Sequence, residues 1–104
     1  VGCLRCFEWK SENGTAGHTV WSPFDSQTQY FQPSASTFMV NYRVADLEAL
    51  LPILRAEGVE QVGEMEVHEY GKFAWVLDPD GHKIELWQPP VGFEDQCGVI
   101  QKSE

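Results

Sequence analysis

The chain has 104 residues, of which 42% are apolar and 12% aromatic, enough for one small domain with a modest core. Seven basic residues against 16 acidic ones give a formal charge of −9, which argues against the basic surface that nucleic-acid binding requires. No apolar run approaches the roughly 18 residues of a membrane-spanning helix, and no basic-then-apolar leader opens the sequence, so we expect a soluble, cytoplasmic protein.

The chain contains three cysteines, Cys3, Cys6 and Cys97, an odd number that does not suit a secreted disulfide framework. Cys3 and Cys6 have C-x-x-C spacing, which is half a zinc site, and no second such pair follows. In a strand, residues three apart point to opposite faces, so these two side chains are poorly placed to chelate together. We expect reduced structural cysteines, with redox or metal roles as the alternative.

Two short strands and a loop are expected before residue 38. The patterns predict a strand over residues 4–10 and another over 18–24, which Pro23 limits to a sheet edge or a strand end. Residues 25–36 show no sustained period and are interpreted as a connecting loop. The aromatic residues of this region make it too apolar for a free linker: Trp21, Phe24, Tyr30 and Phe31. They either pack on the sheet or on a partner chain, or they wall a ligand pocket.

A strand followed by a helix is expected from residue 38 onward. The alternation of residues 38–44 predicts a strand. One face of this strand carries Val40, Tyr42 and Val44, and the other carries Met39, Asn41 and Arg43. Asp46 then suits a helix N-cap, leucines at 47, 50, 51 and 54 form an apolar stripe, and Gly58 suits the C′ position. Pro52 is discordant, because in a helix interior it costs roughly 3 kcal/mol; either the first turn is irregular or the helix kinks.

Residues 59–70 are interpreted as a strand with acidic outward residues, and a hairpin follows. Apolar runs at 73–77 and 83–87 flank Asp78-Pro79-Asp80-Gly81, where Pro79 presets φ and Gly81 tolerates a positive φ. Residues 38–90 therefore predict an α+β fold, a βαβββ module preceded by one or two extra N-terminal strands. We expect one domain over 1–104, with residues 1–37 before the module and a tail over 91–104.

Glu85 is the first site candidate in this hairpin. If Ile84 and Leu86 face a core, the alternation of the strand puts Lys83, Glu85 and Trp87 on the opposite face. A carboxylate between two large apolar neighbours, with Trp75 and Leu77 on the same face, favours a concave and partly apolar surface. The alternative is a solvated glutamate on an exposed sheet face.

The segment DPDGHKIELWQPP, residues 78–90, resembles the closing hairpin of the vicinal-oxygen-chelate superfamily. That superfamily includes glyoxalase I, bleomycin-resistance proteins and extradiol dioxygenases, and its last strand carries a metal-binding glutamate in the same DPDG-x-x-IEL context. The resemblance extends back through FMVNYRVADLEALLPILRAEGV, residues 38–59, and covers about half the chain. It implies a curved mixed sheet and makes Glu85 the counterpart of that glutamate, while it leaves the chemistry open because members differ widely.

The resemblance also bears on a metal site. Two βαβββ modules repeat in the superfamily, so residues 1–10 are similar to the last strand of a first module, with Glu8 as the pseudo-equivalent of Glu85; a chance match is the alternative. Where a second module carries a His or Gln ligand, this sequence has Met39, whose thioether suits hard divalent metals poorly. His18, His68 and His82 have no ligand spacing with Glu85 and are expected on the surface. We expect no cofactor, with a divalent metal on Glu8 and Glu85 as the alternative.

The preferred function is a glyoxalase/bleomycin-resistance-like binding module with an apolar, partly acidic cavity. Its expected lining, in addition to Glu85, is Asn41, Arg43, Trp75, Leu77 and Trp87. A small apolar or cationic ligand is expected there. The alternative is an enzyme of the same superfamily, a lyase, isomerase or dioxygenase in which Glu85 is a metal ligand or general base.

A homodimer is also expected. One βαβββ module leaves strand edges unpaired, and a second copy is the simplest way to cover them. The N-terminal strand and the aromatic loop would pack beside the partner, with an exchanged N-terminal arm as one arrangement.

Overall fold

The computed structural model describes residues 5–10, 12–14 and 16–93. The chain divides into two compact units, Val1–Tyr30 with Phe93–Glu104, and Phe31–Gly92. Among the described residues, no helix is long and apolar enough to cross a membrane.

The first unit contains a β-hairpin. Strands β1 (Arg5–Lys10) and β2 (Ala16–Trp21) pair antiparallel, with Glu8 opposite His18. Strand β2 begins two residues before the expected start and ends ahead of Pro23, which cannot donate a ladder hydrogen bond. In the loop that follows, the rings of Phe24 and Tyr30 stack at 5.7 Å, so two of the loop aromatics pack on each other.

Cys6 departs from the sequence-based expectation. It is disulfide-bonded, so the expectation of reduced cysteines is wrong for this residue. Three cysteines can form one disulfide and leave one thiol, so the odd number did not exclude a disulfide at Cys6. The other two cysteines lie outside the described residues. Because disulfides persist mainly in oxidising compartments, the cytoplasmic location stays a prediction.

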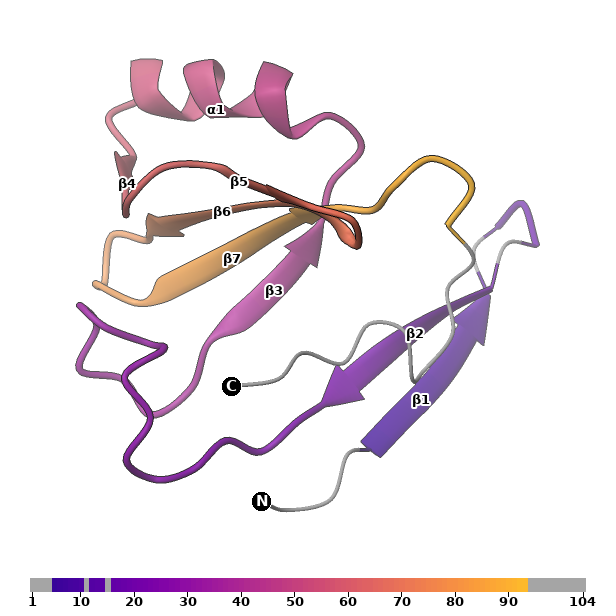
Figure 1. The fold of residues 1–104 in the computed structure, drawn as a ribbon, viewed down its shortest axis with the longest axis horizontal. Coiled ribbons are helices and arrows are strands. Elements are labelled where there is room, and N and C mark those ends of the chain that lie inside the picture. Colours follow the sequence, from indigo (N-terminus) through magenta and orange to yellow (C-terminus); the bar gives the residue numbers. More distant parts are fainter. Residues whose placement is uncertain (1–4, 11, 15, 94–104) are drawn as a thin grey trace. The chain divides into compact units, whose positions relative to one another are not determined.

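The second unit is a five-stranded sheet with one helix on it (Figure 1). Its elements are β3 (Val40–Arg43), α1 (Leu47–Ala56), β4 (Glu60–Gln61), β5 (Glu66–His68), β6 (Gly71–Leu77) and β7 (Lys83–Gln88). The strand order is β3-β7-β6-β4, and β5 also pairs with β6. Strand β3 runs parallel to β7, and the other pairs are antiparallel. The predicted α+β fold with a mixed sheet is confirmed.

Helix α1 begins and ends as its sequence indicates. The Asp46 side chain accepts from the backbone N–H of Ala49 at 3.1 Å, which is an N-cap. At the other end Gly58 has φ +89. The Gly58 N–H donates to the Arg55 carbonyl and the Val59 N–H donates to the Leu54 carbonyl, and these two hydrogen bonds make a Schellman motif. The helix continues through Pro52 after a first turn capped by Asp46, so Pro52 does not end it; a kink there stays a prediction.

The core lies between α1 and one face of the sheet. Its buried members are Leu47, Leu51, Ala74, Val76 and Leu86, and the helix leucines at 50 and 54 pack against it. The side-chain Oε1 of Gln88 also accepts from the backbone N–H of Leu47 at 2.8 Å, which ties the start of the helix to the last strand. The expected apolar stripe and the inward direction of Leu86 are confirmed.

The single strand expected over residues 59–70 is divided in two. Gly63 adopts φ +72 between β4 and β5, a conformation that does not continue a strand. Both halves still pair with β6, and the Val62 N–H bonds the Trp75 carbonyl at 2.8 Å. The βαβββ order therefore holds, with its second strand interrupted.

Candidate functional site

The sheet face turned away from α1 carries the candidate site. Because Ala74, Val76 and Leu86 point to the helix core, the alternate positions of β6 and β7 point the other way. These positions hold Phe73, Trp75, Leu77, Lys83, Glu85 and Trp87. Strand β3 adds Asn41, which is in register with Glu85, and Arg43, which is in register with Trp87. The face predicted from alternation is thus present in the sheet.

Glu85 lies at the centre of this face and is only 3% exposed. Its Oε1 accepts from Nδ2 of Asn41 at 2.6 Å, and its Oε2 accepts from the indole Nε1 of Trp75 at 2.9 Å. Each neighbouring strand therefore supplies one donor to the carboxylate. A buried charge is expensive without such bonds, and the interpretation of Glu85 as a solvated surface residue is excluded by its burial.

Aromatic rings surround this carboxylate on the same face. The ring of Phe73 stacks with Trp75 at 6.4 Å and with Trp87 at 6.3 Å between centroids. The indole Nε1 of Trp87 donates to the carbonyl of Tyr70 at 2.9 Å, which fixes the orientation of that ring. The result is a flat apolar surface held in place by hydrogen bonds.

A cation also belongs to this face. The Nζ of Lys83 lies 5.6 Å from the centroid of the Trp75 ring, a cation–π distance, and the residue is only 9% exposed. The alternation of the strand predicted Lys83 on this face, but Lys83 was not a predicted site residue. The signal that could have identified it is the two-residue spacing from Glu85 in a strand with one face in the core.

The other site candidates are placed less centrally. Leu77 is in register with Lys83 at the turn end of the hairpin, and Arg43 is exposed on the edge strand. Glu8 is exposed on β1 in the first unit, whereas Glu85 lies in the second unit. Its metal role stays a prediction.

The histidines lie in three different places. His18 is on β2 in the first unit, His82 is in the hairpin turn, and His68 is exposed on β5. His68 stacks with Tyr70 at 5.0 Å and contacts the Glu66 carboxylate at 2.9 Å.

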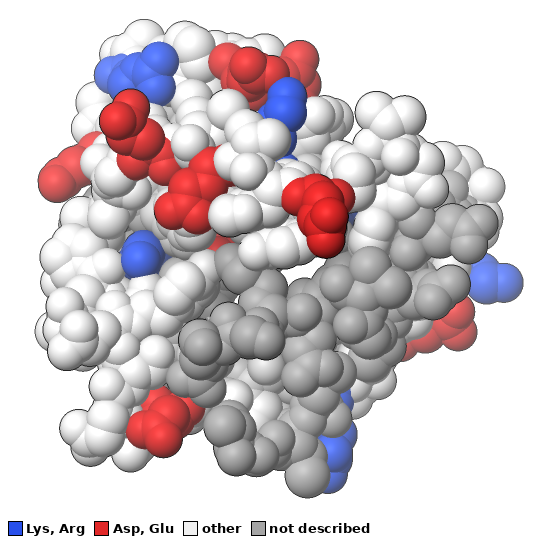
Figure 2. All heavy atoms as spheres, in the orientation of Figure 1, with Lys and Arg blue, Asp and Glu red and all other residues white. Residues whose placement is uncertain are grey.

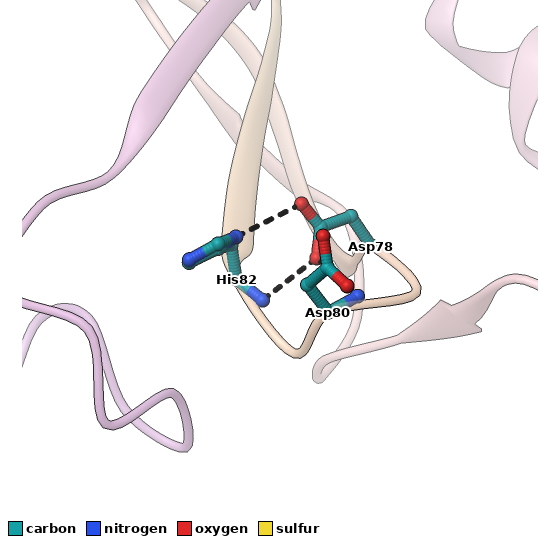
Figure 3. Close-up of side chains that lie close together, drawn as sticks. All are labelled: Asp78, Asp80 and His82. Carbon is teal, nitrogen blue, oxygen red and sulfur yellow. Dashed lines mark hydrogen bonds and ion pairs between the residues drawn. The ribbon is translucent and has the colours of Figure 1, made fainter.

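The hairpin turn holds the only group of three potential metal ligands found among the described residues: Asp78, Asp80 and His82 (Figure 3). Asp78 Oδ1 accepts from the backbone N–H groups of Asp80 and His82, and Oδ2 lies 3.2 Å from the His82 ring nitrogen. The backbone hydrogen bond from His82 is the main cause that lowers the pKa of Asp78. These hydrogen bonds explain why the three side chains lie together: the Asp78 carboxylate accepts from backbone N–H groups of the turn, as aspartates in turns commonly do.

The residues around Glu85 do not fit a metal centre within this unit. Asn41 and Trp75 both present N–H donors to the carboxylate, and these take acceptor positions that a cation would use. The one cluster of possible ligands among residues 5–10, 12–14 and 16–93 excludes Glu85. The side chains on the next strand that share its face are Asn41, which turns its Nδ2 donor toward Glu85, and Arg43, which is a cation.

The surface charge agrees with the composition. Figure 2 shows Asp and Glu side chains in separate groups on the visible face, with single Lys and Arg side chains among them. In the part of that face that the structure describes, the basic side chains do not merge into one patch.

Comparison with known proteins gives one match. The family model described as Glyoxalase/Bleomycin resistance protein/Dioxygenase superfamily matches residues 8–86. This range includes α1, the strands from β2 to β6 and most of β7. No curated protein matches the chain, and no solved structure matches it.

Proposed function

Because the chain belongs to the Glyoxalase/Bleomycin resistance protein/Dioxygenase superfamily, we propose that it is a small-molecule-binding module whose ligand lies on the sheet face opposite α1. One observation carries the proposal: the buried Glu85 carboxylate, hydrogen-bonded by Asn41 and Trp75, lies beside stacked aromatic rings. Ligand sites commonly combine such an apolar surface with a few oriented polar groups.

The arrangement supports binding of a flat molecule that carries a hydrogen-bond donor. Phe73 and Trp87 supply rings whose stacked geometry is already set before any ligand arrives; they are 3% and 8% exposed, so a ligand would have to displace what covers them. The Glu85 carboxylate, held in place by Asn41 and Trp75, is the oriented polar group on this face to which a ligand's donor would bind. A preformed site of this kind orders few side chains on binding, which favours affinity.

A ligand screen tests this proposal. Small aromatic compounds are added to the ¹⁵N-labelled protein, and the four indole N–H signals are followed, with that of Trp75 assigned by its loss in Trp75→Phe. We expect aromatic compounds with a donor group to shift the Trp75 signal in the wild type and less so in Glu85→Gln. Glu64→Gln, an exposed loop glutamate, is the matched control. A screen in which no aromatic compound shifts Trp75 would contradict the proposal.

The proposal includes a homodimer. Strand β3 is at the edge of the sheet, and its apolar side chains Val40 and Tyr42 are exposed, as is Phe38 two residues before the strand. An unpaired edge with an apolar stripe is a liability in a monomer, and a twofold partner covers it with one self-complementary patch. Sedimentation at low micromolar concentration should give about twice the chain mass of 11.8 kDa. A folded species at the chain's own mass would refute the dimer.

The alternative within the superfamily is a metal-dependent lyase, isomerase or dioxygenase that uses Glu85. The N–H donors on both oxygens of Glu85 give this alternative less support than binding alone. Elemental analysis after purification without chelators separates the two. About one Zn, Ni, Mn or Fe per chain, lost in Glu85→Gln and kept in Glu64→Gln, would favour the enzyme.

A further inference from the structure

The loop between β1 and β2 contains an asparagine followed directly by a glycine. Both residues, Asn13 and Gly14, are exposed. Asn-Gly pairs commonly form type I′ hairpin turns, which need a positive φ at both residues. Gly14 has φ +85, but among the described residues a positive φ occurs only at glycines. Asn13 therefore lacks the conformation that would explain the pair as a turn of that type.

An Asn-Gly pair can undergo a reaction of its own. The backbone nitrogen of Gly14 attacks Cγ of Asn13 and forms a new C–N bond. The bond from Cγ to the amide nitrogen breaks, and the amide leaves as ammonia with the proton from Gly14. Water then opens either carbonyl of the resulting succinimide, which gives aspartate or isoaspartate. A side chain on the second residue hinders the attack, and glycine has none.

The structure leaves room for this reaction. A Cβ built on Gly14 would meet no described atom within 4 Å, so nothing described crowds the attacking residue from that side. The Asn13 side chain is exposed. A hydrogen bond at such a position contributes only about 0.5–1.5 kcal/mol net, so a bond of the Asn13 amide slows the reaction by no more than about tenfold. Exposed loop tips are also the parts of a domain that open most readily.

Two other positions in the chain lack this combination. Asn41, the only other asparagine, donates its side chain to the β7 carboxylate at 2.6 Å and is followed by Tyr42, whose side chain hinders attack. Asp80 precedes Gly81, but the Gly81 N–H donates to the Asp78 carbonyl at 2.9 Å, which engages the nitrogen that would attack. Further hydrogen bonds to Asp78 hold the turn around it. The chain thus supplies its own controls.

From these observations we propose that Asn13 is a site of spontaneous modification, converted through the succinimide to aspartate and isoaspartate, and that the isoaspartate loosens the β1–β2 hairpin. Isoaspartate lengthens the backbone between Lys10 and Ala16, the last pair of the ladder. Both products add a negative charge beside Glu12 in a chain whose formal charge is already −9. A hairpin of two strands is marginally stable by itself, so a change in its loop reaches the ladder.

Trp9 reports on the ladder next to this loop. It is opposite Gly17, and a Cβ built on Gly17 would clash with the Trp9 ring, so the indole rests directly on the glycine backbone. Only a glycine allows this approach. Because the pair is adjacent to Lys10 and Ala16, opening of the ladder at its loop end moves the indole away from Gly17.

Rates of conversion in the full chain test the proposal. The protein is incubated at mildly alkaline pH, and mass spectrometry of its peptides distinguishes aspartate from isoaspartate. We expect Asn13 to convert at least about tenfold faster than Asn41, with both products present. The same incubation in urea gives the rates of the unfolded chain. The native rate at Asn13 should lie within about tenfold of its rate in urea, whereas isomerisation at Asp80 should be slowed by a larger factor.

Variants and the Trp9 signal test the effect on the hairpin. The indole N–H signal of Trp9, assigned by its loss in Trp9→Phe, should shift in proportion to the isoaspartate, while that of Trp75 in the second unit stays in place. Asn13→Gln keeps an amide but needs a larger ring for the reaction, so it should abolish the shift. Asn13→Asp is the matched control, because it adds the charge without lengthening the backbone, and the fresh variant should leave the Trp9 signal unshifted.

The outcomes decide both parts of the proposal. Equal rates at Asn13 and Asn41, or a native rate at Asn13 more than about tenfold below its rate in urea, would overturn the modification site. Conversion at Asn13 without a shift of Trp9, or the same shift in fresh Asn13→Asp, would overturn the loosening of the hairpin by isoaspartate. None of these results depends on ligand binding near Glu85, so the proposed function is tested separately.

Discussion

Gly71, at the start of β6, is the position where one added methyl group should disturb the candidate face most. Its φ is +129, and a Cβ built there would lie 2.5 Å from the Gln88 carbonyl oxygen and 2.5 Å from Nε1 of Trp87. The Gln88 oxygen is backbone of the paired strand and cannot rotate away. Gly71→Ala should therefore push β6 from β7 and break the bond from Trp87 to the Tyr70 carbonyl.

The expected cost has three parts. The positive φ costs an L-residue roughly 1–2 kcal/mol, the lost indole hydrogen bond about 1 kcal/mol, and the crowding against the ladder about 1–3 kcal/mol. Together they reduce the free energy of unfolding by about 3–6 kcal/mol, a large share of the 5–15 kcal/mol typical of a domain. Urea unfolding followed by circular dichroism measures the change as a shift in the midpoint.

Gly63→Ala is the matched control for this experiment. Gly63 also has a positive φ, +72, but an added Cβ there meets nothing within 4 Å. It should show the conformational cost alone, roughly 1–2 kcal/mol. If Gly71→Ala destabilises the protein no more than Gly63→Ala, the close approach of β7 and Trp87 to Gly71 is refuted.

Three further changes test other contacts. Gln88→Leu removes the acceptor of the Leu47 N–H and should cost about 0.5–1.5 kcal/mol, read as a fall in melting temperature; no fall would show that this bond does not hold the helix. Trp75→Phe keeps a ring but removes the donor to Glu85 Oε2, so it should lower the free energy of unfolding by roughly 1.5–3 kcal/mol. Glu85→Gln should then lower it less in the Trp75→Phe background than in the wild type. Additive effects of the two substitutions would argue against the hydrogen bond. The pKa of Asp78 is lowered from its ordinary value of 3.8, so its ionised form stabilises the fold above that value, and the stabilisation is lost as the pH falls through the folded-state pKa. Asp78→Asn should therefore flatten the acid limb of stability against pH, and an unchanged limb would contradict the turn contacts.

The elements that were predicted well are those defined by local chemistry. The Asp46 cap, the Gly58 end and the Asp78–Gly81 turn each depend on residues within a few positions, and the structure has all three. The strand expected over residues 59–70 failed because Gly63 was not recognised as an interruption. A glycine in a strand pattern can mark a bulge, a close approach or a break, and periodicity does not distinguish them.

The candidate site was predictable in its membership and less so in its contacts. Alternation places Trp75 and Glu85 on one face once Leu86 is assigned to the core, and the expected β3 alternation adds Asn41. The bond between Asn41 and Glu85 needs the parallel register of β3 on β7, which local patterns do not specify. Lys83 was placed on the right face, but its position over Trp75 depends on side-chain conformation.

The disulfide of Cys6 shows a different limit. Whether a cysteine pairs depends on distance and direction in three dimensions, and on the redox state of the compartment. With three cysteines in the chain, the count excludes only that all of them form disulfides within one chain.

The two donors of Glu85 differ in how far they are from it along the chain. Trp75 is 10 residues away through a tight hairpin, whereas Asn41 is 44 residues away on an edge strand. Closing the longer loop has the larger entropic cost, so the hairpin with its Trp75 bond should assemble first and β3 should add to it. The same order read in reverse predicts that β3 is the first strand of the sheet to separate in native fluctuations. Backbone amides of β3 should then exchange with solvent faster than those of β6, and Asn41 should leave the carboxylate while Trp75 still holds it.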